Sequence, residues 1–435
     1  MLAETSIPEY VKALTAAAAG AFAMPTSVSK LALLWDESHL WGLLAWRGLC
    51  ALGARPHLLR TTDVTAGALD RLQPRVLVVP GGWAGRKAQA LGEAGRAAIR
   101  RYVKAGGTYL GFCGGAGLAL RNQDPTAPLL GLCELRRKPA SRRLPNCSGH
   151  VHCRLHVPQY SASEAVLPVW WPSQFDLDDT TIHILATYQR PGPDFWVADL
   201  PLDDIAPDDL SAWEAIYGIN LHPRWLEGDP CILSAPFGAG SAILSYAHLE
   251  TPNSPQANAL LAALLDLPEA PIPPWDIRQL TPAWEDSALA QMLAAVQGLI
   301  ALGERHFLLT WRTSWLLGWR RGIPASHITT LLAMLSTALS LPISPSTRRW
   351  WHSQSPRCLE LCQRLCEETA RYLVQERRSM TQNPSSPECG GSTRTSMRQR
   401  LFGPFPGYGG VYGQLLQILD ELLAKILPEA PDLKV

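Results

Sequence analysis

The first third of the chain alternates short, continuously apolar runs with longer segments that are apolar on one helical face. These patterns predict helices at 40–52 and 93–104, and strands at 30–35, 56–59, 75–79 and 108–112. A continuously apolar strand suits a sheet that is covered on both faces. Strands that alternate with helices at this spacing predict an α/β fold with a doubly wound, mostly parallel sheet.

The pattern changes in the middle of the chain, over residues 122–230. Strand-like runs at 150–157 and 181–188 stand among aromatic and proline clusters. We interpret this stretch as an insertion that covers the site and shapes access to it. A β-hairpin is then predicted at 231–246, followed by a helix to about residue 267 that Ser254 caps.

Four prolines in residues 268–274 predict a linker, 268–276, between an α/β domain at 30–267 and a second domain at 277–435. Nothing in the second domain is typical of a strand, so we predict an all-α helical domain with a flexible Ser/Gly/Pro-rich loop at 381–396. Its predicted helices are 286–303, 306–321, 326–341, 357–380 and 412–427.

The first 29 residues contain an alanine-rich stretch that predicts an N-terminal helical extension, with a weak export signal as the alternative. Glu4 and Glu9 precede this stretch with Lys12 as the one positive charge, which is unlike the start of a signal peptide. No run of 18 apolar residues occurs, so we expect no transmembrane segment.

Composition excludes some classes of function. Hydrophobic residues make up 47% and charged residues 18% of the chain, as in ordinary globular proteins. The net charge of +1 predicts no nucleic-acid partner. The ten cysteines lack paired spacings, which favours reduced thiols and a cytoplasmic location.

The candidate chemistry is concentrated at Cys113. The sequence Gly-Phe-Cys-Gly-Gly, which follows the predicted strand 108–112, has the layout of a nucleophile elbow. A sharp strand-to-helix turn would present the sulfur above the sheet, and a buried cysteine in a glycine-rich turn is the alternative. Asp36, Gly81 and Gly82 also follow predicted strands, and the carboxyl ends of parallel strands are where reactive groups gather. We therefore expect these residues to bind the substrate or an oxyanion.

His248 and Glu250 are the candidate partners of that cysteine. Residues two apart on an extended backbone lie on one face, so the carboxylate can orient the imidazole and stabilise its protonated form. An imidazolium in turn stabilises a thiolate and can protonate a leaving group. The alternative is a solvated histidine beside a surface glutamate.

The Pro-Gly-Gly loop at 80–82, the cysteine elbow and the late His-x-Glu resemble the class I glutamine amidotransferase-like superfamily, over about residues 30–267. Within it, the chain most resembles the biotin–protein ligase N-terminal domain family. The resemblance implies a flavodoxin-like sheet, with Cys113 as nucleophile, His248 as base and Glu250 as its orienter. It also implies that the N–H groups of Gly82 and Gly114 stabilise an oxyanion.

Two departures from the family pattern concern the substrate. Glutaminases of this class usually carry Gln four residues after the cysteine, where this chain has Gly117, and related proteases often carry His directly after it, where this chain has Gly114. No Gly-Arg-Gly-Arg loop or Walker A loop occurs, so we expect no biotin ligase activity and no cofactor.

Three further groups of residues favour structural roles. His150, His152 and His156 lie near Cys147 and Cys153, but their spacing matches no standard zinc site, so we expect no metal. The helical spacing of Cys358, Cys362 and Cys366 predicts a core stripe. On the predicted helix 306–321, Trp311, Trp315 and Trp319 form a stripe for which we favour domain packing over a membrane surface.

Two functions remain open from the sequence. The first is a thiol-dependent amide hydrolase or acyl transferase that acts on a small-molecule or peptide amide. The second is a non-catalytic ligand-binding or regulatory module on the same fold. The helical domain is a candidate surface for a protein partner or a homodimer.

Overall fold

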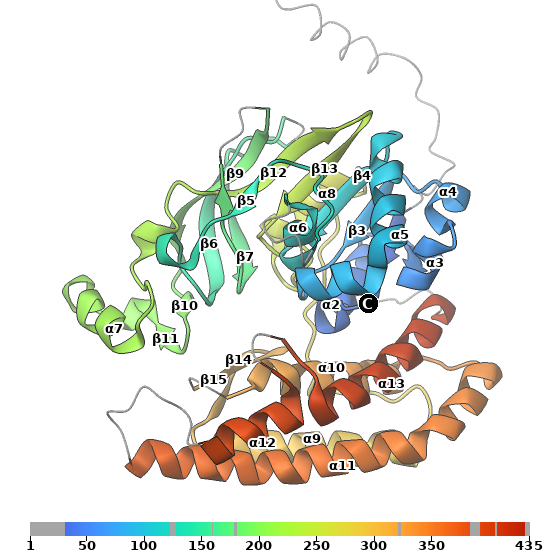
Figure 1. Ribbon diagram of the computed structural model, residues 1–435, viewed down its shortest axis with the longest axis vertical. Helices are drawn as coiled ribbons and strands as arrows, with labels where there is room; N and C mark the ends of the chain where they lie inside the picture. The colour runs from blue at the N-terminus through green and yellow to red at the C-terminus, as the bar shows by residue number, and fades with distance from the viewer. Residues whose placement is uncertain are drawn as a thin grey trace, which may run out of the picture.

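The computed structural model describes residues 31–121, 128–158, 160–177, 181–320, 323–382, 392–404 and 407–430. An α/β part carries an 11-stranded sheet, and a helical part lies beside it (Figure 1). The predicted N-terminal extension, 1–29, lies outside the described residues.

Five parallel strands form one half of the large sheet, in the order β13-β4-β3-β1-β2. They are β1 (Leu31–Leu34), β2 (His57–Leu59), β3 (Val76–Val79), β4 (Thr108–Phe112) and β13 (Gly240–Ser245). The helices around them are α2 (His39–Ala51), α3 (Thr61–Thr65), α4 (Ala68–Leu72), α5 (Ala84–Lys104), α6 (Gly114–Ala119) and α8 (Pro255–Leu265).

Alternate residues of these strands enter two different cores. Leu31 and Leu33 of β1 belong to the core that contains α2 and α8, whereas Ala32 and Leu34 belong to the core that contains α3 to α6. Both faces of the parallel half are therefore covered, which confirms the predicted doubly wound α/β fold. Its carboxyl strand ends meet at one edge, where Asp36, Gly81, Gly82 and Cys113 lie.

Antiparallel strands continue the sheet beyond β13. The predicted hairpin pairs β12 with β13, and β12 then pairs with β9, which pairs with β6. The bounds are β6 (Cys147–Leu155), β7 (Glu164–Trp170), β9 (His183–Pro191), β10 (Trp196–Val197), β11 (Leu200–Pro201) and β12 (Pro230–Phe237). Most of the predicted insertion thus extends the sheet. Within the insertion, β5 (Arg136–Arg137) pairs separately with β8 (Phe175–Asp176). Helix α7 (Leu210–Tyr217) lies at the outer end of the insertion (Figure 1).

The C-terminal region is mainly helical, as predicted. Its helices are α9 (Ser287–Arg305), α10 (Ala325–Ser340), α11 (Pro345–Gln382), α12 (Ser392–Phe402) and α13 (Gly410–Ile426). Asp286 caps α9 by accepting a hydrogen bond from the Leu289 N–H at 2.8 Å. Both ends of the flexible loop predicted at 381–396 are helical, because α11 extends to Gln382 and α12 starts at Ser392. Residues 383–391 of this predicted loop lie outside the described part.

The prediction of a helix at 306–321 is wrong. The segment forms a β-hairpin of β14 (Leu309–Thr313) and β15 (Leu316–Trp319), with an irregular register between Trp311 and Thr313. The three tryptophans therefore form no helical stripe. The hairpin lies on the side of the helical part that faces the sheet (Figure 1).

Among the described helices, α9 is the one that is long and apolar enough to cross a membrane by length and composition, with a mean hydropathy of 1.3. It packs against α10 and α11, and its inward face carries Met292, Val296 and Ile300. The predicted cysteine stripe on α11 belongs to the same interior, because Cys358, Cys362 and Cys366 are all buried.

Candidate active site

Cys113 stands at the turn between β4 and α6. Its backbone has φ 45° and ψ −102°, a left-handed conformation that a residue with a side chain rarely adopts. The turn is held because the Cys113 N–H donates to the Ser245 carbonyl at 2.7 Å and the Gly117 N–H donates to the Cys113 carbonyl at 2.9 Å. The thiol is half-buried, with its sulfur 4.0 Å and 3.9 Å from the Trp170 and Trp171 carbonyl oxygens.

The loop after β3 packs directly on this turn. A Cβ added to Gly114 would lie 1.8 Å from the Gly82 carbonyl oxygen, so the two backbones approach too closely for any side chain. Gly82 itself has φ 115°, and a Cβ there would meet the Glu37 carbonyl oxygen at 2.4 Å. Within the described residues, neither the Gly82 nor the Gly114 N–H donates a hydrogen bond, which leaves both available to an oxyanion beside the thiol.

His248 and Glu250 follow β13 and are almost fully buried. His248 Nδ1 lies 2.7 Å from Glu250 Oε1, and the two side chains are 0% and 1% exposed. Burial alone lowers the pKa of His248, but the Glu250 charge and the interaction with Cys113 raise it to about 10. Apart from this interaction with Cys113, His248 Nε2 has no hydrogen-bond partner within the described residues, so it is available to exchange a proton with the thiol or a substrate.

A cluster of tryptophans lies beside the thiol and the imidazole. The Trp41 ring lies 4.6 Å from the His248 ring and 5.8 Å from Trp171, measured between centroids. The hairpin of the helical part supplies Trp315, which lies 5.2 Å from Trp170, and Trp319, which lies 5.1 Å from Trp171. The hairpin of the helical part therefore packs against the tryptophans that line the site.

Two cavities meet at Cys113. The interdomain cavity has a volume of about 200 Å³ and is lined by Glu37 and Trp41 of the α/β part and by His327 and Tyr408 of the helical part. The arginine cavity has a volume of about 340 Å³ and is lined by Arg121, Arg137, Ser173, Tyr246 and Gly117, among others. Gly82, Trp83, Cys113 and Trp171 line both cavities, so a ligand in either one can reach the sulfur.

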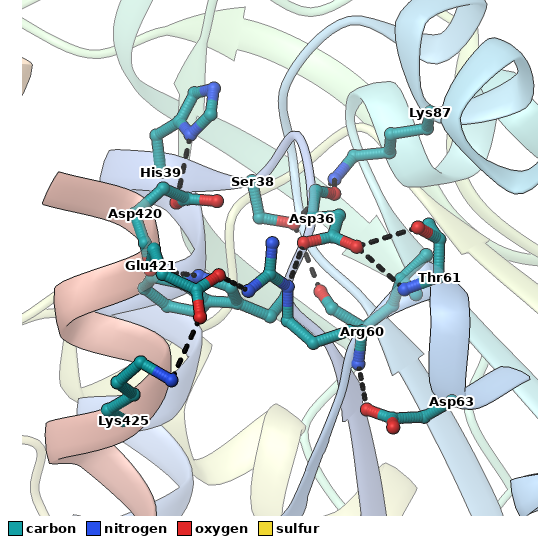
Figure 2. Close-up of polar contacts among 12 residues, drawn as sticks. Asp36, Ser38, His39, Arg60, Thr61, Asp63, Lys87, Asp420, Glu421 and Lys425 are labelled. Atoms are coloured by element: carbon teal, nitrogen blue, oxygen red, sulfur yellow. Dashed lines mark hydrogen bonds and ion pairs between the residues drawn. The ribbon is translucent and has the colours of Figure 1, made fainter. Parts of the chain in front are cut away.

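Asp36 lies at the same sheet edge but does not line either cavity. Its carboxylate accepts hydrogen bonds from Arg60 Nε, from the Thr61 N–H at 2.6 Å and from the Thr61 hydroxyl at 2.7 Å. Arg60 also bonds Glu421 of α13 at 2.6 Å, and Figure 2 shows its guanidinium between the two carboxylates. The structure thus places Asp36 in a contact that joins β1 and β2 to α13.

Lys87 is a residue near the site that no pattern in the sequence singles out. It occupies an ordinary position on α5, yet its side chain is fully buried, and Nζ bonds the Ser38 hydroxyl and lies 3.4 Å from the Asp36 carbonyl oxygen (Figure 2). Burial lowers the pKa of Lys87 to about 7, although the charges of Glu37, Asp36 and Cys113 oppose that shift. The Lys87 side chain thus supports the segment after β1, where Glu37 lines the interdomain cavity.

The cluster of histidines on β6 forms no metal site within the described residues. His150 Nδ1 bonds Asp194 Oδ2 at 2.8 Å, and its Nε2 lies 3.3 Å from the Ser254 hydroxyl. The sequence predicts that Ser254 caps α8, but its side chain makes no capping hydrogen bond. The cysteines of this strand, Cys147 and Cys153, point into the core on the opposite face.

The part of the chain that holds the elbow has a recognisable relative. Residues 71–123 match the family described as "Biotin-protein ligase, N terminal". The match spans β3, α5, β4 and α6, which carry Gly81, Gly82, Cys113 and Gly114. The match and the sheet together indicate a glutamine amidotransferase-like α/β fold. A comparison with curated proteins finds no match.

Solved structures resemble about half of the chain. A candidate GMP synthase subunit from Thermoplasma acidophilum is 12% identical, with a TM-score of 0.34, over 55% of this chain and 93% of the other. A candidate ThuA-like protein from Bacteroides uniformis is 14% identical, with a TM-score of 0.35, over 57% and 93%. A β-galactosidase from Bacillus circulans is 12% identical, with a TM-score of 0.32, over 55% and 30%. Likenesses this distant do not indicate an activity.

Proposed function

We propose that this protein is a thiol-dependent amide hydrolase or acyl transferase. One observation carries the proposal: a thiol in a strained elbow interacts with the buried His248–Glu250 pair and lines two cavities. A nucleophile, a base oriented by a carboxylate and two free N–H groups are the parts that acyl transfer requires. The match to the biotin–protein ligase N-terminal family supports the placement of the elbow.

The proposed reaction follows from these groups. His248 Nε2 takes the proton of the Cys113 thiol, and the sulfur forms a bond to the amide carbon. The Gly82 and Gly114 N–H groups stabilise the negative oxygen that results. His248 then protonates the leaving amine as the C–N bond breaks, which leaves a thioester. Water or a second amine attacks the thioester, releases the acid or a new amide, and returns the proton to the thiol.

The raised pKa of His248 suits this sequence of steps. With a pKa of about 10, the imidazole holds a proton firmly at neutral pH, which favours an imidazolium beside a thiolate. The charge of Glu250 sustains this state without being consumed. All cysteines that the structure describes are free, and we propose a reducing, cytoplasmic setting for the thiol.

Gly117 favours a second candidate, a ligand-binding module without turnover. This position lines the arginine cavity, and glutaminases of the superfamily usually carry Gln there. The absence of a Gln side chain at this position argues against glutamine as the substrate. A ligand that binds equally well to wild type and Cys113→Ala would support this second candidate, whereas a trapped thioester on Cys113 would exclude it.

The test of the first proposal is selective alkylation of Cys113, with every cysteine tracked by peptide mapping. An ordinary thiol reacts slowly much below pH ~8.5. We expect iodoacetamide to modify Cys113 well below that pH, and His248→Ala to remove this selectivity. Cys113→Ala should then abolish any amide turnover while the fold persists. A Cys113 that reacts like the buried thiols Cys133 and Cys147 in wild type would overturn the proposal.

A further inference from the structure

The residues that line the arginine cavity all belong to the α/β part. Arg137 of β5 and Ser173 of the segment after β7 line it, and both belong to the stretch between α6 and β12. Gly117 borders it without a side chain, and a Cβ there would make an ordinary contact of 3.4 Å with the Ala84 Cβ. The absent side chain leaves space between the thiol and the arginine residues.

Of the two arginines that line this cavity, Arg121 pairs with Glu134 at 3.0 Å, whereas Arg137 has no carboxylate partner within the described residues. Neighbouring cations are paired, since Lys138 bonds Asp229 at 2.6 Å and Arg142 bonds Asp176 at 2.8 Å. Arg137 and Arg143 make no side-chain hydrogen bond or ion pair within the residues the structure describes. Arg143 is 9% exposed, its Nε is buried without a partner, and burial first and then the charge of Arg137 lower its pKa. Two like charges held together without a counter-ion favour an anion between them.

Buried hydroxyl groups face the same space. Tyr246 is 1% exposed, and its hydroxyl and that of Ser173 have no hydrogen-bond partner within the described residues apart from each other. Burial raises the pKa of Tyr246 above its ordinary value, and the charge of Cys113 adds to this shift. The nearby Ser173 hydroxyl and the charges of Arg137 and Arg143 oppose it. The phenol therefore keeps its proton and can donate a hydrogen bond, and it lies within the influence of both the thiol and the arginines.

We propose that the arginine cavity binds the anionic group of the molecule on which Cys113 acts, a carboxylate or a phosphate. Arg137 supplies a charge that lines the cavity, Tyr246 and Ser173 supply hydroxyl donors, and the buried Arg143 adds a charge that interacts with Arg137. An anion there satisfies the unpaired polar atoms, which is the usual state of buried polar groups. The substrate class is then an amide that carries an anionic group. This last step rests on the proposed function, whereas the anion site does not.

The test compares two alkylating reagents that differ in charge. Iodoacetate carries a carboxylate and iodoacetamide does not, so the ratio of their rates at Cys113 reports anion recognition beside the sulfur. Arg137→Gln removes the unpaired charge that lines the cavity and leaves Arg121, which pairs with Glu134. Arg136→Gln is the matched control, because Arg136 is an exposed neighbour on β5 that points to the opposite side and does not line the cavity.

We expect the iodoacetate-to-iodoacetamide ratio at Cys113 to fall about tenfold in Arg137→Gln, the loss typical of one charged hydrogen bond, and to stay unchanged in Arg136→Gln. Glutarate or inorganic phosphate should slow the iodoacetate reaction in wild type at constant ionic strength, and the stronger competitor identifies the anion. Chloride at the same ionic strength is the control for screening.

Equal ratios in wild type and both variants would overturn the anion site, even where iodoacetamide still labels Cys113 selectively. A ratio that depends on Arg137, in a protein whose Cys113 is inert toward amides, would support the anion site while the proposed function fails. The two proposals can therefore fail separately.

Discussion

At the scale of single residues, the His248–Glu250 pair links the stability of the protein to pH. The pKa of His248 is raised to about 10, whereas a histidine in an unfolded chain titrates near ~6.5. Between these values the folded protein holds a proton that the unfolded chain releases. The stabilisation is therefore fully present below about pH 6.5 and is lost as the pH rises toward about 10.

We expect the urea midpoint of wild type to decrease across this range of pH. Glu250→Gln removes the charge that raises the pKa of His248, so its midpoint should depend less steeply on pH. The measurement is urea unfolding, followed by tryptophan fluorescence, at a series of pH values for both proteins. Identical slopes in the two proteins would show that Glu250 does not hold the proton on His248.

The sequence could indicate Cys113, His248 and Glu250, because an elbow and an i, i+2 pair are local patterns with a direct chemical meaning. Lys87 and Arg137 lack such patterns. Each stands on its element as an ordinary charged residue. Lys87 is set apart by its burial, and Arg137 by its lack of a counter-ion among the residues that the structure describes. Both properties depend on which distant segments pack nearby, and that information is not local.

At the scale of elements, the parallel half of the sheet was predictable, but the hairpin β14–β15 was not. Trp311, Trp315 and Trp319 are spaced as on one helical face, and the same residues also suit strands, where aromatic and β-branched side chains are favoured. The contacts of Trp315 and Trp319 with Trp170 and Trp171 are formed in the hairpin. Tertiary packing decided between two patterns that the sequence permits.

The hairpin gives a prediction for Trp315. Its ring is 3% exposed and lies between Trp41 and Trp170, so Trp315→Ala should leave a cavity and lower the free energy of unfolding by about 3–5 kcal/mol. Trp311→Ala is the control, because Trp311 is half-buried on the same hairpin and stacks against Arg278 at 5.1 Å. Urea unfolding of both variants measures the difference. Equal losses would contradict the packing role of Trp315.

At the scale of the whole molecule, the two parts share one interior. A continuous buried cluster includes Leu43 of α2, Leu331 of α10 and Leu419 of α13, and α2 packs against α10. Polar contacts add to this interface, since Trp35 Nε1 donates to the Asp420 carbonyl at 3.2 Å and Arg60 bonds Glu421. An interface with a continuous apolar core holds domains in a fixed relation. The walls of the interdomain cavity are then a permanent feature of the site.

This shared interior predicts that the protein survives a cut between its parts. Residues 278, 279, 281 and 282 are exposed in the connection before α9, so a protease site can be placed there. After cleavage, we expect the α/β and helical fragments to elute together in gel filtration and to melt in one calorimetric transition, because separation would expose the common core. The uncut protein with the same inserted site is the control. Fragments that elute apart, or that melt in two transitions, would show that each part folds by itself and that the cavity between them can open.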